Sequence, residues 1–592
     1  MTDKQDLKEP FIDDYSKNSE NKDPIGSDPE RGNELSNSKN EENTNSHVEG
    51  QNFIEKVETD PSQGDQTGEN DSQNEFDPKG EEFRLGGRMP LLTLIILSIG
   101  PIISQIFASL FGVFNSLWVT KSIGSQGLEV FGAAFVIDYI QIGFAQYLMI
   151  SINIRISYLY GEKAGEKCGQ LYVDFLRLAL VFGSITAAII IPITQPLTKW
   201  LGADADLASM CFSYVIPEAS LSCVNYFYMI NCGVLQAEGH SFYFCFAQIA
   251  TFILNILVFD PIFFVWIKTP IWGCTLATAL SQLIVGTFLA VVILKGKFTF
   301  KPKAKMFVSA FTPETRRALL VGIPELVMEL SLSLPLIMMQ KYIEKASNAI
   351  GVYAEAMESW ALTQRLYTFV EAFELGFVFG YLPAASYAFG AKRYNRLLKL
   401  TLHLLWLATS ISTFLAYAIV IFVKQVSSIW STDETFLEVS SHFIPIIFYA
   451  MPLIGIAYMA PALFEAMQKA VSAAVLSVLS LLVTPMTVSS ILHYTKKNDP
   501  YRVMLTYPIS DAIGALLYVA FVVNPIIFLW KAPKDEWEAK KDEEIRREKE
   551  EKKKVKQTNK LNELKKKKKE HHEDVTEDTV NPEPLMNETE EL

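Results

Sequence analysis

The sequence predicts an all-α membrane protein in which twelve transmembrane helices form two six-helix repeats flanked by polar tails. The distribution of charge is the first reason. Residues 1–88 carry 10 basic and 23 acidic side chains and residues 531–592 carry 17 and 19, whereas the 442 residues between them hold only 26 and 24. About 11% of this middle segment is therefore charged, against roughly 25% in a soluble domain. This excludes a soluble enzyme, and we expect no enzymatic activity.

An uncharged run is the second reason. Met89–Thr120 contains no charged residue over 32 positions, and about 20 apolar residues are enough for a helix to cross a bilayer. The run follows 88 polar residues, so it is not a signal peptide. Counting such apolar segments gives twelve, near residues 89–120, 130–152, 175–198, 207–237, 241–267, 269–294, 318–340, 359–389, 400–423, 440–465, 470–495 and 503–530.

Internal repetition is the third reason. The string SYLYGEK at 157–163 recurs as SYAFGAK at 386–392, an offset of 229 residues. Pro217 and Pro445 keep nearly the same offset, as do LQAEGH from Leu235 and FEAMQK from Phe464. Six spans per repeat is an even number, which predicts parallel lobes related by an axis along the membrane normal, with a site between them near the midplane.

These boundaries divide the chain into five parts. Residues 1–88 are a disordered acidic tail because they lack the apolar surface needed to fold. Two six-helix lobes at 89–294 and 318–530 are joined by a basic linker at 295–317. The tail 531–592 alternates Lys and Glu, which predicts a solvated helix followed by disorder; contact with anionic lipid through its lysines is the alternative.

The loops predict the orientation of the chain, because Lys and Arg concentrate in short cytoplasmic loops. The loop between the lobes is the richest, with seven basic residues from Lys295 to Arg317. We expect both termini to be cytoplasmic, and a multi-pass protein of the plasma membrane.

Carboxylates inside the predicted spans are the candidate functional groups. An ionised carboxylate at the bilayer centre costs about 3 kcal/mol even on insertion scales, and few basic residues are available as partners. Protons, cations, cavity water or a cationic substrate must neutralise them, which points to transport. The nine acids are Asp138, Glu218, Asp260, Glu325, Glu329, Glu371, Glu374, Glu465 and Asp511.

Spacing groups some of these acids. Glu325 and Glu329 are four residues apart and Glu371 and Glu374 are three apart, so each pair shares a helix face. We predict a cluster in the second lobe that is protonated in one state and binds a cation in another; the alternative for a single residue is that it caps a broken helix or faces water. Asp138, Asp511, Glu465 and Gln236 are candidates for a substrate cavity.

In the first lobe, Asp260 precedes Pro261 and follows Asn255 in the apolar run FILNILVFDPIFFVWI. Proline leaves a carbonyl unpaired and so creates a polar notch beside the carboxylate. This combination predicts a site for transported Na⁺ or H⁺, or else a carboxylate bonded to neighbouring helices. We expect no structural metal and no cofactor beyond the coupling ion, H⁺ or Na⁺. A GxxxxGK[ST] motif and the HExxH, GxSxG and CxxC patterns are missing, so no residue is predicted to be catalytic.

Several strings resemble the multidrug and toxic compound extrusion (MATE) family over 89–530. GPIISQIFASLFGVFNSLWVTKSIGSQGLEVFGAA is similar to its first span and loop, and NILVFDPIFFVWIKTPIWGCTLATALSQ to its spans 5 and 6. GIPELVMEL is similar to the start of span 7, and GFVFGYLPAASYAFGAKRYNR to the end of span 8.

The resemblance implies a V-shaped pair of six-helix bundles that exports organic cations in exchange for H⁺ or Na⁺ by alternating access. It places Asp260, Asn255 and Thr278 at the family's first-lobe cation site. Two positions depart from the family pattern: Asn115 stands where the first-span Asp is usual, and Asn255 is one residue further from Asp260. The eukaryotic span 7 Glu would fall near Leu332, one and two turns after Glu329 and Glu325.

Three functions compete at this point. The leading expectation is a secondary active multidrug or xenobiotic antiporter. A lipid or lipid-linked precursor flippase would need basic residues in the cavity of the first lobe, and a channel would conduct faster than any antiporter turns over. We expect a monomer whose partners are small-molecule substrates and the lipid bilayer, with no nucleic acid.

Overall fold

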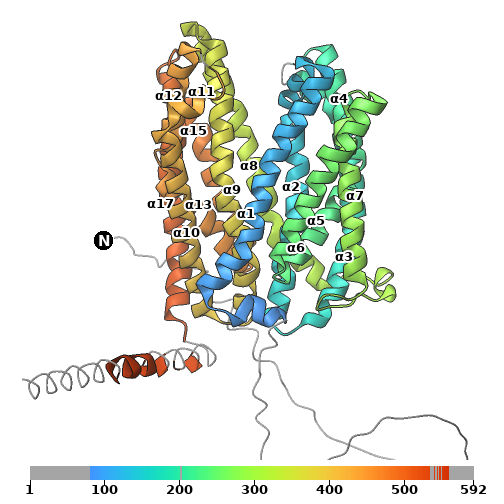
Figure 1. Ribbon diagram of the computed structural model, residues 1–592, viewed down its shortest axis with the longest axis vertical. Coiled ribbons are helices and arrows are strands. Elements are labelled where there is room, and N and C mark those ends of the chain that lie inside the picture. The colour runs from blue at the N-terminus through green and yellow to red at the C-terminus, as the bar shows by residue number, and fades with distance from the viewer. Residues whose placement is uncertain are drawn as a thin grey trace, which may run out of the picture. The chain divides into compact units, whose positions relative to one another are not determined.

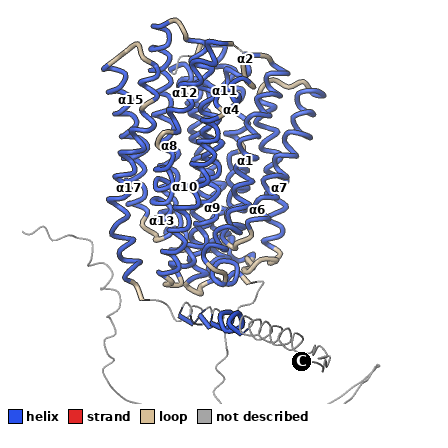
Figure 2. Tube along the Cα trace, turned by 60° about the vertical axis from the view of Figure 1, so that its left-hand side comes forward, coloured by secondary structure: helices blue, strands red, loops and turns tan. Residues whose placement is uncertain are grey.

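The computed structural model describes residues 80–200, 203–431 and 433–533 and, with gaps, residues 539–558. The described residues form helices and contain no strand (Figure 2). Most of residues 1–88, and residues 559–592, lie outside the described part, and with them most of the predicted tails. The predicted tail helix is represented by helical residues 550–558.

The first lobe contains a long helix for each predicted span, together with short irregular turns (Figure 1). Its elements are α1 (Pro90–Ile123), α2 (Ser125–Gly161), η2 (Gly165–Lys167), α3 (Cys168–Trp200), α4 (Ala205–Ser220), α5 (Ser222–Ala237), α6 (Ser241–Ile253), η3 (Leu254–Phe259), η4 (Ile262–Ile267) and α7 (Trp272–Leu294).

The second lobe repeats this arrangement after a linker that carries the short turn η5 (Ala304–Phe307). Its elements are α8 (Pro313–Ile350), α9 (Tyr353–Gly390), α10 (Tyr394–Ile421), α11 (Val423–Ser428), α12 (Glu434–Phe448), α13 (Met451–Ala466), α14 (Ala470–Ser477), η6 (Val478–Val483), α15 (Thr484–Thr495), α16 (Pro500–Met504) and α17 (Thr506–Lys531).

Nine helices of the described chain are long and apolar enough to cross a membrane, and two bent pairs, α4 with α5 and α12 with α13, raise this number to eleven. The predicted span 359–389 corresponds to α9. This helix has 38 residues but is too polar to be counted with the others, because it carries Glu371 and Glu374. The twelve predicted segments therefore all correspond to helices, although length and composition alone support eleven spans.

The repeat extends to an irregularity of the backbone. In each lobe a π-helical turn ends directly before an X-Pro pair: η3 precedes Asp260-Pro261, and η6 precedes Thr484-Pro485. A π-turn inserts one extra residue into a helix and often marks a functional site. The two lobes differ at this point, because the carboxylate of the first lobe is replaced by a threonine in the second.

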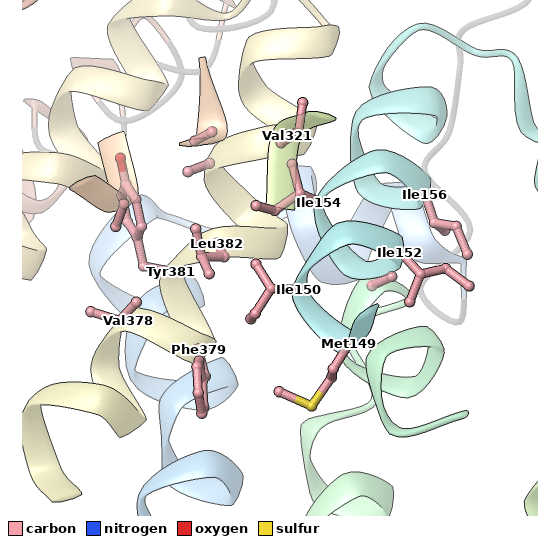
Figure 3. Packing of buried hydrophobic residues seen from close by; sticks show 14 of the residues in the cluster. Met149, Ile150, Ile152, Ile154, Ile156, Val321, Val378, Phe379, Tyr381 and Leu382 are labelled. Carbon is pink, nitrogen blue, oxygen red and sulfur yellow. The ribbon is translucent and has the colours of Figure 1, made fainter. Parts of the chain in front are cut away.

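Two contacts join the lobes: α1 packs along α9, and α2 packs along α8. We call the end of the bundle at which α1 begins and α17 ends the tail end, and the opposite end the mouth end. Nearer the tail end, α2 and α9 present apolar side chains to each other, among them Ile150, Ile154 and Leu382, which are at most 1% exposed (Figure 3). This apolar layer leaves no polar path between the lobes there.

The start of the described chain lies against the tail end. Phe83–Gly87 forms the turn η1, and Leu85 is fully buried. The Arg396 guanidinium donates to the carbonyl oxygens of Leu85 and Arg88 at 2.9 and 2.7 Å, and Arg84 Nε donates to the carbonyl of Glu238 at 2.7 Å. The expected disordered tail therefore ends before residue 83, because these backbone groups find partners in both lobes.

Candidate functional site

A cavity of about 850 Å³ lies between the lobes at the mouth end. Glu129 near the start of α2, Ala203 before α4 and Tyr353 at the start of α9 mark its outer part. Glu371 and Asp511 mark its depth, about midway along α9 and α17. A cavity of this size can bury most of a drug-sized molecule.

Aromatic and acidic side chains dominate the polar character of this lining. Among the described lining residues, Lys341 is the only Lys or Arg. Aromatic faces attract cations, and carboxylates add a full opposite charge. The aromatic lining residues are Phe135, Tyr139, Tyr353, Trp360, Tyr367 and Tyr507, and the acids are Glu129, Glu344, Glu371 and Asp511.

One face of α9 supplies the core of this lining. Trp360, Gln364, Tyr367 and Glu371 are spaced at i, i+4, i+7 and i+11, which places them in one row along a helix. The Gln364 amide donates to the Tyr507 hydroxyl of α17 at 2.8 Å, and the ring of Tyr507 lies 5.8 Å from that of Tyr367. The sequence analysis did not single out these aromatic residues, although this helical spacing ahead of Glu371 is a signal that identifies them.

Glu371 is anchored where the cavity is deepest. The Tyr458 hydroxyl of α13 donates to its carboxylate in a short hydrogen bond, and Tyr139 of the first lobe lies in the electrostatic field of both Glu371 and Glu329. Groups from both lobes therefore converge on this carboxylate.

Further acids continue from Glu371 towards the tail end. Glu329 interacts electrostatically with Glu371 and Glu325, and Glu325 interacts with Glu465. Glu329 packs against the first lobe, since a Cβ at Gly143 of α2 would lie 3.2 Å from its Cβ. The structure thus brings Glu325, Glu329 and Glu371 into one row, as their spacing predicts, and adds Glu465 to it.

The first-lobe site forms around Asp260, which is fully buried. The orientation of the Asn255 amide that satisfies its neighbours lets its NH₂ group donate to Asp260 Oδ2 at 3.2 Å and to Asn115 Oδ1 at 3.1 Å. Its oxygen then accepts from the Thr278 backbone N–H at 2.9 Å. All four residues predicted for this site therefore meet.

The extra residue between Asn255 and Asp260 is accommodated by the π-turn η3. The Asp260 N–H donates to the Asn255 carbonyl, an i+5 bond of π type. Five-residue spacing therefore places the two side chains together, as four-residue spacing does in an α-helix. Among the described residues, Asp260 Oδ1 has no hydrogen-bond partner.

The proposed cavity residues have different positions. Asp511 lines the cavity. Asp138 lies within the first lobe, where it accepts a hydrogen bond from Tyr214 at 3.4 Å and interacts electrostatically with Glu218. Gln236 is fully buried near the tail end and accepts from Asn153 Nδ2 at 3.0 Å. Asp138, Gln236 and Glu465 thus lie outside the lining of this cavity.

Below the cavity, an ion pair between the lobes closes the tail end. Arg155 of α2 donates through Nε to Glu314 Oε2 of α8 at 2.9 Å and through a terminal nitrogen to Gln468 Oε1 at 3.0 Å. Asp174 of α3 accepts the backbone N–H of Thr312 at 3.1 Å, directly before α8. The sequence could not reveal these contacts, since the partners are more than 130 residues apart.

Comparisons with known proteins follow from this geometry. The MatE family model matches residues 101–260 and 347–489, about half of the chain. The probable multidrug resistance protein YoeA of Bacillus subtilis (strain 168) is 20% identical over 438 residues, covering 73% of this chain and 92% of that protein. The multidrug export protein MepA of Staphylococcus aureus (strain MSSA476) is 18% identical over 410 residues, covering 68% and 87%.

Solved structures share the fold. A crystal structure of MATE in complex with MaL6 superposes with a TM-score of 0.70 at 20% identity, covering 77% of this chain and 100% of that one. An outward-facing multidrug resistance MATE family transporter of the MOP superfamily also gives a TM-score of 0.70, at 19% identity, covering 77% and 99%. With the family model matched across both repeats, the chain belongs to the MATE family of membrane transporters.

Proposed function

We propose that the protein is a secondary active antiporter that exports organic cations, including drugs and other xenobiotics, in exchange for H⁺ or Na⁺. It works by alternating access in the plasma membrane, with both termini in the cytoplasm. The observation that carries this proposal is the interlobe cavity, whose lining combines four carboxylates with six aromatic rings and one lysine.

The chemistry of the lining favours a cationic substrate. A buried organic cation keeps its charge stabilised by carboxylates and by aromatic faces, each of the latter contributing about 0.5–2 kcal/mol. An anionic lipid headgroup would meet mainly acids there, which argues against the flippase alternative. The names of the relatives YoeA and MepA, a probable multidrug resistance protein and a multidrug export protein, support the same substrate class.

The arrangement of the lobes supports a mouth-open state of an alternating-access cycle. The cavity reaches the mouth end, while the apolar layer around Ile154 and the Arg155–Glu314 pair close the tail end. In this orientation a substrate cation leaves the cavity outward as a coupling ion neutralises the acids that held it. Glu371 then serves substrate and coupling ion in turn, because two positive charges cannot share one carboxylate favourably.

The test uses the purified full-length protein in sealed vesicles loaded with an organic cation dye. An H⁺ gradient and a Na⁺ gradient are imposed separately, and dye flux is followed by fluorescence. We expect one of the gradients to drive flux and Glu371→Gln to reduce it at least tenfold, because this change removes the charge where the cavity is deepest.

Glu434→Gln is the matched control, because Glu434 is exposed at the start of α12 and has no place in the cavity. It should transport like the wild type. Ion currents far above carrier turnover would instead identify a channel, and an absence of dye flux with either gradient would refute organic cation antiport.

A further inference from the structure

A second buried polar cluster lies inside the second lobe, between α9, α10 and α13 and outside the interlobe cavity. Its centre is Glu374 of α9, which is fully buried. Among the described residues, neither carboxylate oxygen of Glu374 has a hydrogen-bond partner. Its charged neighbour is the acid Glu371, so nothing in this part of the described chain supplies a compensating positive charge.

Three hydroxyl groups of α10 belong to the same cluster. Ser412 is fully buried and interacts with Glu374, although outside hydrogen-bond geometry. Thr409 and Thr413 lie three residues before and one after Ser412, which places all three on one side of α10. Within the described chain, none of the three hydroxyl oxygens has a hydrogen-bond partner.

This lack of partners is unusual for hydroxyls in these helices. Ser104, Thr194 and Ser281 donate to the carbonyl four residues earlier at 2.7–2.9 Å, and Thr401, two turns earlier on α10, does so at 2.8 Å. Buried polar atoms without a partner cost free energy, typically 1–3 kcal/mol each. Three such hydroxyls beside an unpaired carboxylate therefore need an explanation, and a bound ligand is one.

The backbone of α13 is shaped to leave room for this cluster. A Cβ at Gly455 would lie only 1.9 Å from Thr409 Oγ1. Glycine at this position lets α13 approach α10 without displacing the hydroxyl. Three residues further along α13, Tyr458 engages Glu371, which separates the second acid of the predicted Glu371/Glu374 pair from this cluster.

We propose that Glu374, Ser412, Thr409 and Thr413 form a binding site for a dehydrated Na⁺ ion within the second lobe. Hard cations take oxygen ligands, and a set with one carboxylate and otherwise neutral hydroxyls carries the single negative charge that a monovalent ion balances. Protonation of Glu374 would remove the charge but would leave most of these hydroxyl oxygens unsatisfied. The role of the site in coupling rests on the proposed antiport, whereas the binding of Na⁺ does not.

The test measures ²²Na⁺ binding to the purified full-length protein in detergent, at constant ionic strength balanced with choline chloride. The Asp260→Asn variant serves as the background because it removes the first-lobe carboxylate. We expect this variant to bind one Na⁺ and to show a melting temperature that rises with Na⁺. Adding Glu374→Gln should abolish both effects.

Ligand variants keep the test decisive if Glu374→Gln does not fold. Ser412→Ala and Thr409→Val should each weaken Na⁺ binding about tenfold, since each removes an oxygen next to the charged pair, and Gly455→Ala should weaken it by displacing Thr409. Ser410→Ala is the matched control, because Ser410 lies on the same helix and is exposed; it should bind like the background.

Two results would overturn the site: no Na⁺ binding in the Asp260→Asn background, or equal binding with and without the Glu374 and Ser412 substitutions. Uptake of a proton in place of Na⁺ would also overturn it. Dye transport is scored separately. Na⁺ binding without dye flux would reject the antiport and keep the site, while dye flux without Na⁺ binding would reject the site alone.

Discussion

Gly161 and Gly390 meet across the tail end of the two lobes, each at the end of one copy of the repeated SYxxG motif. A Cβ at Gly161 would lie 2.2 Å from the carbonyl oxygen of Tyr387, and a Cβ at Gly390 would lie 2.3 Å from that of Tyr158. Tyr158 and Tyr387 are themselves repeat partners, 229 residues apart. The contact is therefore reciprocal, and the axis that relates the lobes passes beside it.

Gly161→Ala should weaken this closed tail end. The added methyl group has no room against the backbone of α9, and overpacking of this kind costs about 1–3 kcal/mol. We expect a lower melting temperature for the purified protein. Gly112→Ala is the control, because a Cβ at Gly112 meets nothing within 4 Å, so this change should leave stability equal or slightly higher. Equal melting temperatures for the two variants would contradict the close contact.

The Arg155–Glu314 pair should contribute strongly to the same closure. Both side chains are almost buried, with exposures of 5% and 10%, and loss of one partner leaves the other charge uncompensated. We expect Arg155→Gln to destabilise the protein by about 3–5 kcal/mol. Breaking the exposed pair Lys496–Asp499 with Lys496→Gln should cost less than about 1 kcal/mol. Chemical denaturation of both variants measures the difference, and similar losses would show that the interlobe pair does not bear on stability.

Those parts of the fold that local patterns encode could be predicted from the sequence. The apolar runs and the repeated strings predicted the helices and the two lobes, and the row formed by Glu325, Glu329 and Glu371 follows from helical periodicity. The resemblance placed Asn115, Asn255, Asp260 and Thr278 together. What the pattern did not show was that the additional residue before Asp260 belongs to a π-turn, because apolar residues such as Leu257 fit α- and π-helices equally well.

Contacts between distant segments could not be predicted. Tyr458 and Glu371 are 87 residues apart and Arg155 and Glu314 are 159 apart, and helical periodicity says nothing about which faces of different helices meet. The same limit applies to Leu85, which belongs to a polar stretch and is buried only because Arg396, far along the chain, binds the backbone around it.

The aromatic wall of the cavity should determine affinity for organic cations. Trp360 is 5% exposed and its ring lies 6.2 Å from that of Tyr507. We expect Trp360→Leu to keep most of the apolar contact but lose a cation–π contribution of about 0.5–2 kcal/mol, which corresponds to roughly a 2- to 30-fold weaker dissociation constant. Equilibrium binding of a quaternary ammonium dye and of an uncharged analogue of similar size measures this. An equal loss for both ligands would indicate a packing role alone.

Glu238, just beyond the end of α5, should make stability depend on pH. Its side chain is fully buried, and burial raises its pKa from 4.5 to about 7, although the Tyr160 hydroxyl, the Arg84 charge and the Thr299 N–H oppose the shift. Burial and the charge of Arg84 lower the pKa of His240 to about 4. His240 is therefore neutral where Glu238 ionises, and their 3.8 Å approach is not an ion pair there.

The sign of the effect follows from proton binding. Between pH 4.5 and 7 the folded protein keeps the Glu238 proton that the unfolded chain has lost, so the stabilisation is complete below pH 4.5 and disappears as the pH rises through 7. The shift corresponds to a loss on the order of 3 kcal/mol. Glu238→Gln keeps the acceptor for Tyr160 and cannot ionise, so we expect it to flatten the fall in melting temperature between pH 5 and 8. Glu162→Gln, at an exposed position nearby, should retain the slope of the wild type, and parallel curves for the wild type and Glu238→Gln would contradict the assignment.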